Sequence, residues 1–91
     1  LGEFAKYYIH SLGHGVGLEI HELPNLSKKS KFKLKLNDIV TCEPGIYFPN
    51  KFGIRIEDLL VIKKDNPEIL SKTSKKLKIF NQVTKTWENV F

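Results

Sequence analysis

The sequence predicts one small domain made mostly of antiparallel β-strands. Residues 32–36 (FKLKL) alternate apolar and cationic side chains, which is the period of a strand with one face in water. Residues 38–42 (DIVTC) and 52–64 (FGIRIEDLLVIKK) are rich in the β-branched side chains that favour strands. Ninety-one residues are enough for one domain only, and no stretch stays apolar for long enough to cross a membrane.

The first third of the chain is expected to turn back on itself. Three glycines between positions 13 and 17 disfavour a helix, so residues 7–12 and 16–22 are predicted to be short strands on either side of a glycine-rich bend. Residues 24–27 (PNLS) should then form a loop, because proline, asparagine and serine are turn-forming residues.

Turn-forming pairs separate the strands expected in the rest of the chain. These strands are residues 32–36, 38–42, 46–48, 52–64, 68–71 and 75–80. Pro44-Gly45, Pro49-Asn50 and residues 65–68 (DNPE) supply the turns. Residues 81–91 have no clear period and stay unassigned. The chain offers no obvious helix to cover the sheet, lacks methionine and starts with Leu1, so we expect a piece of a longer protein whose other part covers one sheet face.

The net charge of +5 comes almost entirely from lysine. Arg55 is the only arginine among fifteen cationic residues, and lysines gather in residues 28–35 and 72–78. Nucleic-acid surfaces commonly use arginine together with stacked aromatic rings, and these clusters have neither beyond Phe32 and Phe80. A solvated face is the preferred interpretation, with a lysine-rich nucleic-acid hairpin as a weaker alternative. We therefore predict neither a nucleic-acid partner nor a membrane partner.

Cys42 is the only cysteine, so it cannot form an internal disulfide. A chain without disulfides is compatible with a reducing compartment, and we expect a cytoplasmic protein. Two roles are open to Cys42: the nucleophile of a thiol protease, paired with a histidine, or a buried structural side chain. A lone cysteine in an apolar strand is more typical of a small core residue, and this is the prediction for Cys42.

The strongest sign of chemistry is a cluster of histidines and carboxylates. His10, His14 and His21 lie within twelve residues, while Glu43 and Glu57 occur in apolar strands. A buried carboxylate is costly unless it is paired, hydrogen-bonded or bound to a metal. A metal-binding or catalytic role for the two glutamates is therefore preferred over a structural ion pair.

Several familiar motifs do not fit this region. HSLGH has the histidine spacing of a zincin but has Ser11 where the catalytic glutamate should be. GHGVG lacks the lysine and the hydroxyl residue of a phosphate loop, and no Cys-x-x-Cys pair exists for a structural zinc site. What remains is one histidine with two glutamates, a ligand mixture suited to divalent Mn, Co, Fe or Zn acting on water. Three ligands cannot fully hold two metals, so further aspartates from elsewhere would be needed.

Three ordered motifs carry a family resemblance. HSLGHGVGLEIHELP, then TCEPGIY and then FGIRIEDLLVI resemble the C-terminal part of the creatinase/aminopeptidase (M24) family of dinuclear metallopeptidases, within it the Xaa-Pro branch of prolidase and aminopeptidase P. Methionine aminopeptidase is less similar in the context of the last glutamate. The resemblance implies an α/β (α+β) pita-bread fold, of which this chain is the second half, mostly curved antiparallel sheet.

The resemblance also assigns roles by motif. His14, Glu43 and Glu57 match the family's metal ligands, and Glu43 would in addition exchange protons with the metal-bound water. His21 matches a histidine that contacts the substrate and the tetrahedral intermediate. His10 matches a second histidine near the substrate, and Arg55 an arginine that orients the carboxylates. The family's two aspartate ligands precede this region and are not matched here.

The implied function is hydrolysis of Xaa-Pro peptide bonds by a hydroxide that bridges two divalent metal ions, with manganese expected first and Co, Zn or Fe as alternatives. The expected partners are a peptide with proline at its second position and further copies of the protein in a homo-oligomer. Residues 1–80 would belong to the catalytic domain and 81–91 to a C-terminal tail, and the piece alone should be inactive. A noncatalytic peptide-binding module on the same fold is the alternative.

Overall fold

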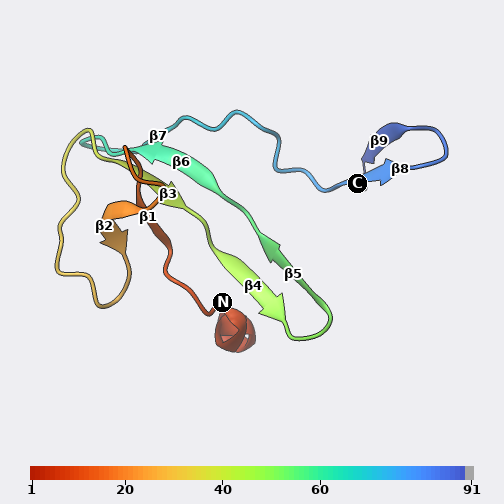
Figure 1. The fold of residues 1–91 in the computed structure, drawn as a ribbon, viewed down its shortest axis with the longest axis horizontal. Coiled ribbons are helices and arrows are strands. Elements are labelled where there is room, and N and C mark those ends of the chain that lie inside the picture. Colours follow the sequence, from red (N-terminus) through yellow and green to blue (C-terminus); the bar gives the residue numbers. More distant parts are fainter. Residues whose placement is uncertain (90–91) are drawn as a thin grey trace.

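A computed structural model describes residues 1–89 of the chain (Figure 1). It contains one short 3-10 helix, η1, followed by nine strands. Their bounds are η1 (Gly2–Tyr7), β1 (Gly13–Gly15), β2 (Glu22–Leu26), β3 (Ile39–Cys42), β4 (Gly45–Phe48), β5 (Phe52–Arg55), β6 (Asp58–Val61), β7 (Glu68–Ile69), β8 (Lys78–Asn81) and β9 (Thr86–Asn89). Every strand pair in this part of the chain is antiparallel, as the sequence predicts.

The central sheet has five strands in the order β2-β1-β3-β6-β7. Its best-covered strand is β3, where Val40 has no exposed surface and Thr41 is 4% exposed. The β-branched residues of β3 fill this position well, because branched side chains pack closely on a pleated surface. The prediction of a buried strand at 38–42 is confirmed, and the core lies directly beside the histidine and glutamate motifs.

β3 and β4 run beside β5 and β6 as one long ribbon with a break in its middle (Figure 1). The β3–β6 ladder ends at the pair Cys42–Asp58, and the β4–β5 ladder begins at Gly45–Arg55. Pro44 lies in the gap and has no N–H to donate, so a regular ladder cannot pass through it. The predicted strand 52–64 is therefore wrong as a single element: it is divided into β5 and β6, and these belong to different sheets.

The predictions for the N-terminal third are wrong in position. Of the predicted strand 7–12, Tyr7 ends η1 and residues 8–12 form no strand, and of the predicted strand 16–22 only Glu22 is in a strand. β1 instead runs through the glycines at which a bend is expected. The reason is a close approach of backbones: a Cβ atom on Gly13 would overlap the carbonyl of Thr41, so only glycine lets β1 lie against β3. The expected loop at 24–27 is largely strand, since β2 includes Pro24 and Asn25. Proline is tolerated there because β2 is an edge strand.

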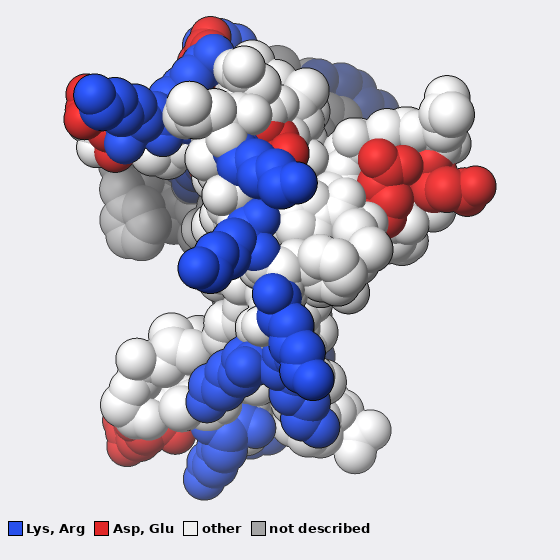
Figure 2. Space-filling view, turned by 90° about the vertical axis from the view of Figure 1, so that its left-hand side faces the viewer, with Lys and Arg blue, Asp and Glu red and all other residues white. Residues whose placement is uncertain are grey.

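Residues 32–36 do not form the predicted strand. They belong to the long connection between β2 and β3, where alternation has no neighbouring strand to pair with among the described residues. This connection carries five lysines, and Figure 2 shows cationic side chains gathered on the face of the molecule at the left of Figure 1.

No helix of residues 1–89 is long and apolar enough to cross a membrane.

The C-terminal region forms a hairpin of its own. β8 pairs with β9, and the rings of Phe80 and Trp87 lie 5.2 Å apart. The short strand expected at 75–80 is confirmed in part, as is the one at 68–71, while β9 falls in the stretch that sequence patterns left unassigned. Residues 90–91 of that stretch lie outside the described part. The division of the chain at residue 80 stays a prediction.

Candidate metal centre

The break in the long ribbon places both motif glutamates next to each other. Glu43 and Pro44 follow β3, and Ile56 and Glu57 precede β6, so the two carboxylates lie on opposite sides of the same interruption. The break is bridged by one backbone hydrogen bond, from Ile56 N–H to the Pro44 carbonyl at 3.2 Å. Irregular points in paired strands are common next to active sites because they redirect side chains.

His14 is held in the middle of β1 between two buried glycines. Its Nδ1 lies 2.9 Å from the carbonyl oxygen of Gly15. A carbonyl can only accept, so Nδ1 carries the proton and Nε2 is left with a free lone pair in the neutral ring. This hydrogen bond on the distal nitrogen is the arrangement that orients metal-binding histidines.

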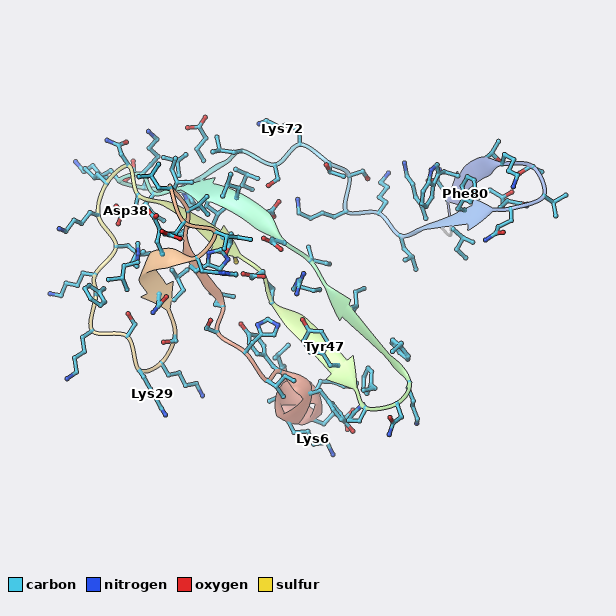
Figure 3. All side chains as sticks on the ribbon, viewed as in Figure 1. Lys6, Lys29, Asp38, Tyr47, Lys72 and Phe80 are labelled. Atoms are coloured by element: carbon cyan, nitrogen blue, oxygen red, sulfur yellow. The ribbon has the colours of Figure 1, made fainter. Side chains whose placement is uncertain are left out.

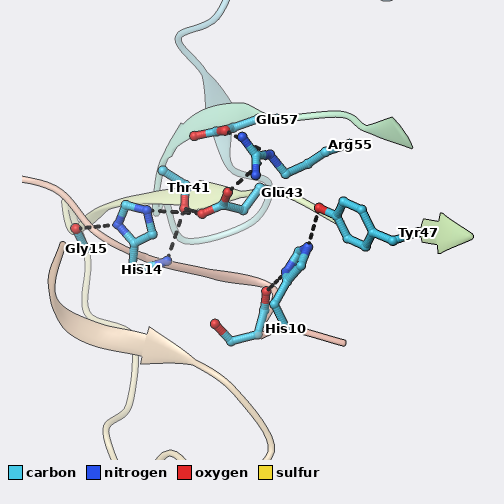
Figure 4. A network of polar contacts seen from close by, with 9 residues as sticks. His10, His14, Gly15, Thr41, Glu43, Tyr47, Arg55 and Glu57 are labelled. Carbon is cyan, nitrogen blue, oxygen red and sulfur yellow. Dashed lines mark hydrogen bonds and ion pairs between the residues drawn. The ribbon is translucent and has the colours of Figure 1, made fainter. Parts of the chain in front are cut away.

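Three strands converge on Glu43 (Figure 4). Its Oε1 lies 3.1 Å from His14 Nε2 and accepts a 3.1 Å hydrogen bond from the hydroxyl of Thr41. The same hydroxyl accepts the backbone N–H of His14 at 3.1 Å. The side chains of His14 and Glu43 are each only 16% exposed, and the Glu43 N–H donates to the Leu12 carbonyl at 2.7 Å. β1 and β3 therefore fix these two side chains relative to each other.

Arg55 joins the two carboxylates from the other side of the break. Its Nε lies 3.7 Å from Glu43 Oε2 and 3.8 Å from Glu57 Oε2. These distances are ion-pair distances rather than hydrogen bonds. The Arg55 and Glu57 side chains are 53% and 44% exposed, so water screens this part of the cluster more than the His14–Glu43 pair.

A cleft of about 440 Å³ unites the cluster. His14, His21, Glu43, Arg55 and Glu57 all line it. His21 lies on the exposed bend between β1 and β2, and its ring meets that of His14 edge to face at 4.3 Å. Five of the six residues singled out from the sequence thus border one cleft.

The sixth residue, His10, borders a neighbouring hollow instead. Its Nε2 lies 2.8 Å from the hydroxyl of Tyr47, and its Nδ1 lies 2.7 Å from the Ser11 carbonyl. Nδ1 therefore donates, and Nε2 of the neutral ring accepts from Tyr47. In Figure 3, Tyr47 lies on β4, on the side of η1.

The donor set fits a divalent cation. In the neutral ring, His14 Nε2 and Glu43 Oε1 both have only lone pairs to offer, yet they face each other at 3.1 Å. Such a contact needs a second ring proton or a cation near both atoms. Imidazole and carboxylate are ligands shared by Mn, Co, Fe and Zn sites. Within residues 1–89, no three His, Cys, Asp or Glu side chains converge closely enough to hold a metal as they stand, so Glu57 lies beside the pair rather than in it.

Two ionisable groups that do not line the cleft have raised pKa values. The pKa of the Tyr8 phenol is raised, first by burial and then by the negative charges of Cys42 and Glu43. Burial also raises the pKa of the Cys42 thiol, and Asp58 adds to the effect. A raised thiol pKa opposes the nucleophilic role considered for Cys42 and agrees with a structural one.

Sequence analysis missed Thr41 and Tyr47 as members of the polar network. Both lie in the TCEPGIY motif, at even spacings from Glu43, and so share its face of the ribbon when the strands are regular. Their hydroxyls could have been considered for that reason. In the sequence, Thr41 and Tyr47 indicate only strands, because β-branched and aromatic residues are common strand formers.

A family comparison decides how this cleft is classified. The sequence profile of metallopeptidase family M24 matches residues 1–64. The chain belongs to metallopeptidase family M24. The family resemblance seen in the three motifs is therefore confirmed, and every motif residue of the cleft lies within the matched segment.

Individual M24 relatives carry names from the Xaa-Pro branch. The chain is 49% identical to the Xaa-Pro dipeptidase of Pyrococcus furiosus over 74 residues, which are 81% of this chain and 21% of that protein. It is 42% identical to the Xaa-Pro dipeptidase of Lactobacillus delbrueckii subsp. lactis over 76 residues, 84% of this chain and 21% of the relative. The chain thus spans about a fifth of the length of these M24 relatives.

Solved M24 structures share the fold. The prolidase of Pyrococcus furiosus superimposes with a TM-score of 0.77 at 48% identity, covering 80% of this chain and 22% of that one. The Xaa-Pro dipeptidase of Bacillus anthracis gives 0.79 at 44% identity, covering 82% and 21%. The mostly antiparallel sheet is the matching part of the prolidase pita-bread fold, as the resemblance implied.

Proposed function

We propose that the chain is part of a dinuclear metallopeptidase that hydrolyses Xaa-Pro peptide bonds. The observation that carries the proposal is the His14–Glu43 pair, with an oriented imidazole nitrogen 3.1 Å from a carboxylate oxygen and Glu57 in the same cleft. His14, Glu43 and Glu57 would hold divalent ions, manganese first, with Co, Zn or Fe as alternatives, and ligands outside the chain would complete the site. When bound, such ions supply Lewis acidity and lower the pKa of water.

The chain's own residues would orient the reaction. Glu43 is held by Thr41 on one oxygen and faces Arg55 with the other, so it is positioned to take up and release a proton at the cleft. His21 is exposed at the cleft and would donate to the oxygen that becomes negative during attack. Arg55 would keep the two carboxylates aimed into the cleft. His10, which is hydrogen-bonded to Tyr47, would contact the substrate outside the cleft itself.

The proposed substrate is a peptide with proline at its second position. Its scissile bond is a tertiary amide without an N–H, so recognition must use the ring and the chain termini. The names of the M24 relatives support this branch of the family. We further propose a cytoplasmic, homo-oligomeric enzyme, with residues 1–80 in the catalytic domain and the 91 residues inactive by themselves.

Hydrolysis by the intact protein tests the proposal. After removal of metals with a chelator, Mn²⁺ should restore cleavage of Ala-Pro but give little cleavage of Ala-Ala. Glu68→Gln, on the exposed strand β7 away from the cleft, is the matched control and should behave like the wild type. Equal cleavage of both dipeptides would reject the proline specificity, and full activity in the metal-free protein would reject the metal requirement.

A further inference from the structure

The segment that follows β7 crosses the ribbon immediately beside Glu57. The Leu70 N–H donates to the Leu59 carbonyl at 2.8 Å, and the Leu59 N–H donates to the hydroxyl of Ser71 at 2.7 Å. Ser71 also lines the cleft that contains Glu57. Residues 70–75, here called the strap, therefore hold the backbone of β6 two residues after the proposed ligand. The strap lies beyond the residues matched by the M24 profile.

The strap ends on a carboxylate that has little other support. Asp58 is next to Glu57 in sequence; its Oδ1 is buried and has no hydrogen-bond partner within residues 1–89. Lys75 Nζ lies 2.8 Å from this atom, outside hydrogen-bond angles, so the contact is an ion pair. A buried carboxylate oxygen is costly without a cation beside it. Lys75 supplies that cation from the end of the strap.

Asp58 directly follows Glu57 and lies in a hollow that adjoins the cleft. Glu57 lines both the cleft and this hollow, Leu59 lines only the cleft, and Asp58 and Lys75 line only the hollow. Asp58 also pairs with Cys42 in the last step of the β3–β6 ladder, directly before the break. Fixing Asp58 therefore fixes the edge of the break from which Glu57 projects. Within residues 1–89, Lys75 is the only charged group at ion-pair distance from Asp58.

We propose that Lys75 is a positioning residue of the metal centre: its ion pair with Asp58 fixes the start of β6 and thereby the placement of Glu57. This inference rests on the proposed role of Glu57 as a metal ligand. Figure 3 shows the route of the strap, with Lys72 in the segment that leads from the sheet to the hairpin of Phe80. Lys72 Nζ donates to the carbonyl of Ile69 in β7 at 3.2 Å and does not contact Asp58.

Metal affinity and hydrogen exchange of the intact protein test the inference. Lys75→Met should weaken Mn²⁺ binding about three- to tenfold in a calorimetric titration, less than the roughly 10- to 100-fold cost of losing a direct partner of a ligand. The amides of residues 57–60 should exchange faster in the same variant. Lys75→Arg keeps the charge and should restore both values. Lys76→Met is the matched control, because Lys76 uses only its backbone N–H, toward Ser74.

Ser71→Ala provides a second route should Lys75→Met not accumulate as folded protein. It removes the acceptor of the Leu59 N–H and should likewise speed exchange at residue 59 and weaken Mn²⁺ binding. Ser30→Ala removes a comparable acceptor, that of the Phe32 N–H, in the connection between β2 and β3 and should change neither. Unchanged Mn²⁺ affinity in the Lys75 or Ser71 variant would overturn the inference, as would equal losses in Lys75→Met and Lys75→Arg. A wild type that binds Mn²⁺ without cleaving Ala-Pro would reject the proposed function alone, since the affinity comparison would still decide the role of Lys75.

Discussion

The two sides of the candidate metal cleft differ in how deeply their side chains are buried and how closely they are held together. On one side, His14 and Glu43 are 16% exposed and are tied together by Thr41 through hydrogen bonds of 3.1 Å. On the other, Arg55 and Glu57 are about half exposed and meet at 3.8 Å. Both carboxylates lie in the break of the ribbon, but Glu43 is tied to the paired strands β1 and β3 through His14 and Thr41, whereas Glu57 has, among the described residues, only the ion pair with Arg55.

The contrast in burial predicts which residues would adjust if a metal bound. A cation near His14 and Glu43 would meet side chains that are already oriented, and such preorganisation lowers the cost of binding. Glu57 would have to complete the site from a more exposed, better solvated position. The two sides should therefore respond differently to substitution, to added metal and to loss of supporting groups.

Substitution of Glu43 should have the largest effect. Glu43→Ala in the intact protein should lower kcat/KM for Ala-Pro about a thousandfold, because it removes a ligand and the proposed proton carrier together, and proton transfer alone is worth 10²–10⁴-fold. Excess Mn²⁺ should not restore activity. Glu68→Gln is again the control, and recovery of wild-type rates at high Mn²⁺ would contradict the double role.

Substitution of Glu57 should remove metal and activity together. A ligand should cost more than the roughly 10- to 100-fold loss typical of groups behind a ligand. Since Glu57 only completes a site that His14 and Glu43 begin, excess Mn²⁺ should recover part of the activity of Glu57→Ala. Parallel titrations of Mn²⁺ binding and Ala-Pro cleavage measure this. If Glu57→Ala cleaved Ala-Pro at the wild-type rate, the assignment of Glu57 as a metal ligand would be wrong.

Substitution of Arg55 should have a milder effect. Arg55→Met should weaken Mn²⁺ binding about tenfold, in the range known for groups behind metal ligands, because the carboxylates lose the guanidinium that orients them and this loss outweighs the removal of its repulsion for the metal ion. Arg55→Lys keeps the charge but not the planar fork, so it should fall between Arg55→Met and the wild type. A Lys variant as poor as the Met variant would show that shape rather than charge holds the carboxylates.

Thr41 tests the ordered side through stability. Thr41→Val should lower the free energy of unfolding by about 1–3 kcal/mol, because the His14 N–H loses its acceptor and Glu43 its donor in a buried place. Thr41→Ser keeps the hydroxyl and should lose much less. Urea unfolding of the metal-free protein measures both. Equal stability of Val and wild-type proteins would mean that the hydroxyl does not tie the two ligands together.

Cys42 gives the smallest and most local effect. Its raised pKa means that at pH 8 the folded protein holds less thiolate than an ordinary cysteine would. The stability that the neutral thiol contributes is present below the ordinary pKa of cysteine and is lost as pH rises through the higher folded value. Iodoacetamide labelling followed by mass spectrometry should therefore have a midpoint at higher pH in the native protein than in urea. Coincident midpoints would contradict a buried thiol.

The site was easier to predict than the strands around it. Glu43 and Glu57 stand out in the sequence because carboxylates in apolar segments are costly without a function, although in the structure both lie outside the strands and Glu57 is exposed. The choice of His14 among the three histidines comes from the family motifs. Their convergence could not be worked out from spacing, since it depends on a break at Pro44 that separates two ladders. Thr41 and Tyr47 were missed because hydroxyl and aromatic residues are also ordinary strand formers.

The wrong strands have a common cause. Alternation in residues 32–36 describes what a strand could do but not whether a neighbour exists, and here the backbone finds none in the described part. The glycines around His14 suggested a bend, while their actual use is to let β1 approach Thr41. In the first case a tertiary neighbour is missing and in the second a close tertiary contact is present, and neither can be read from local propensity.

The most direct test of the central claim is a crystal structure of the intact protein grown with Mn²⁺, with anomalous diffraction measured above the manganese absorption edge. An anomalous peak from Mn²⁺ is expected in the cleft, within coordination distance of His14 Nε2 and Glu43 Oε1. The Glu57 carboxylate should be turned toward this peak from across the break. An empty cleft in crystals of a protein that binds Mn²⁺ in solution, or a peak bound by other residues, would contradict the assignment of His14, Glu43 and Glu57 as the metal centre.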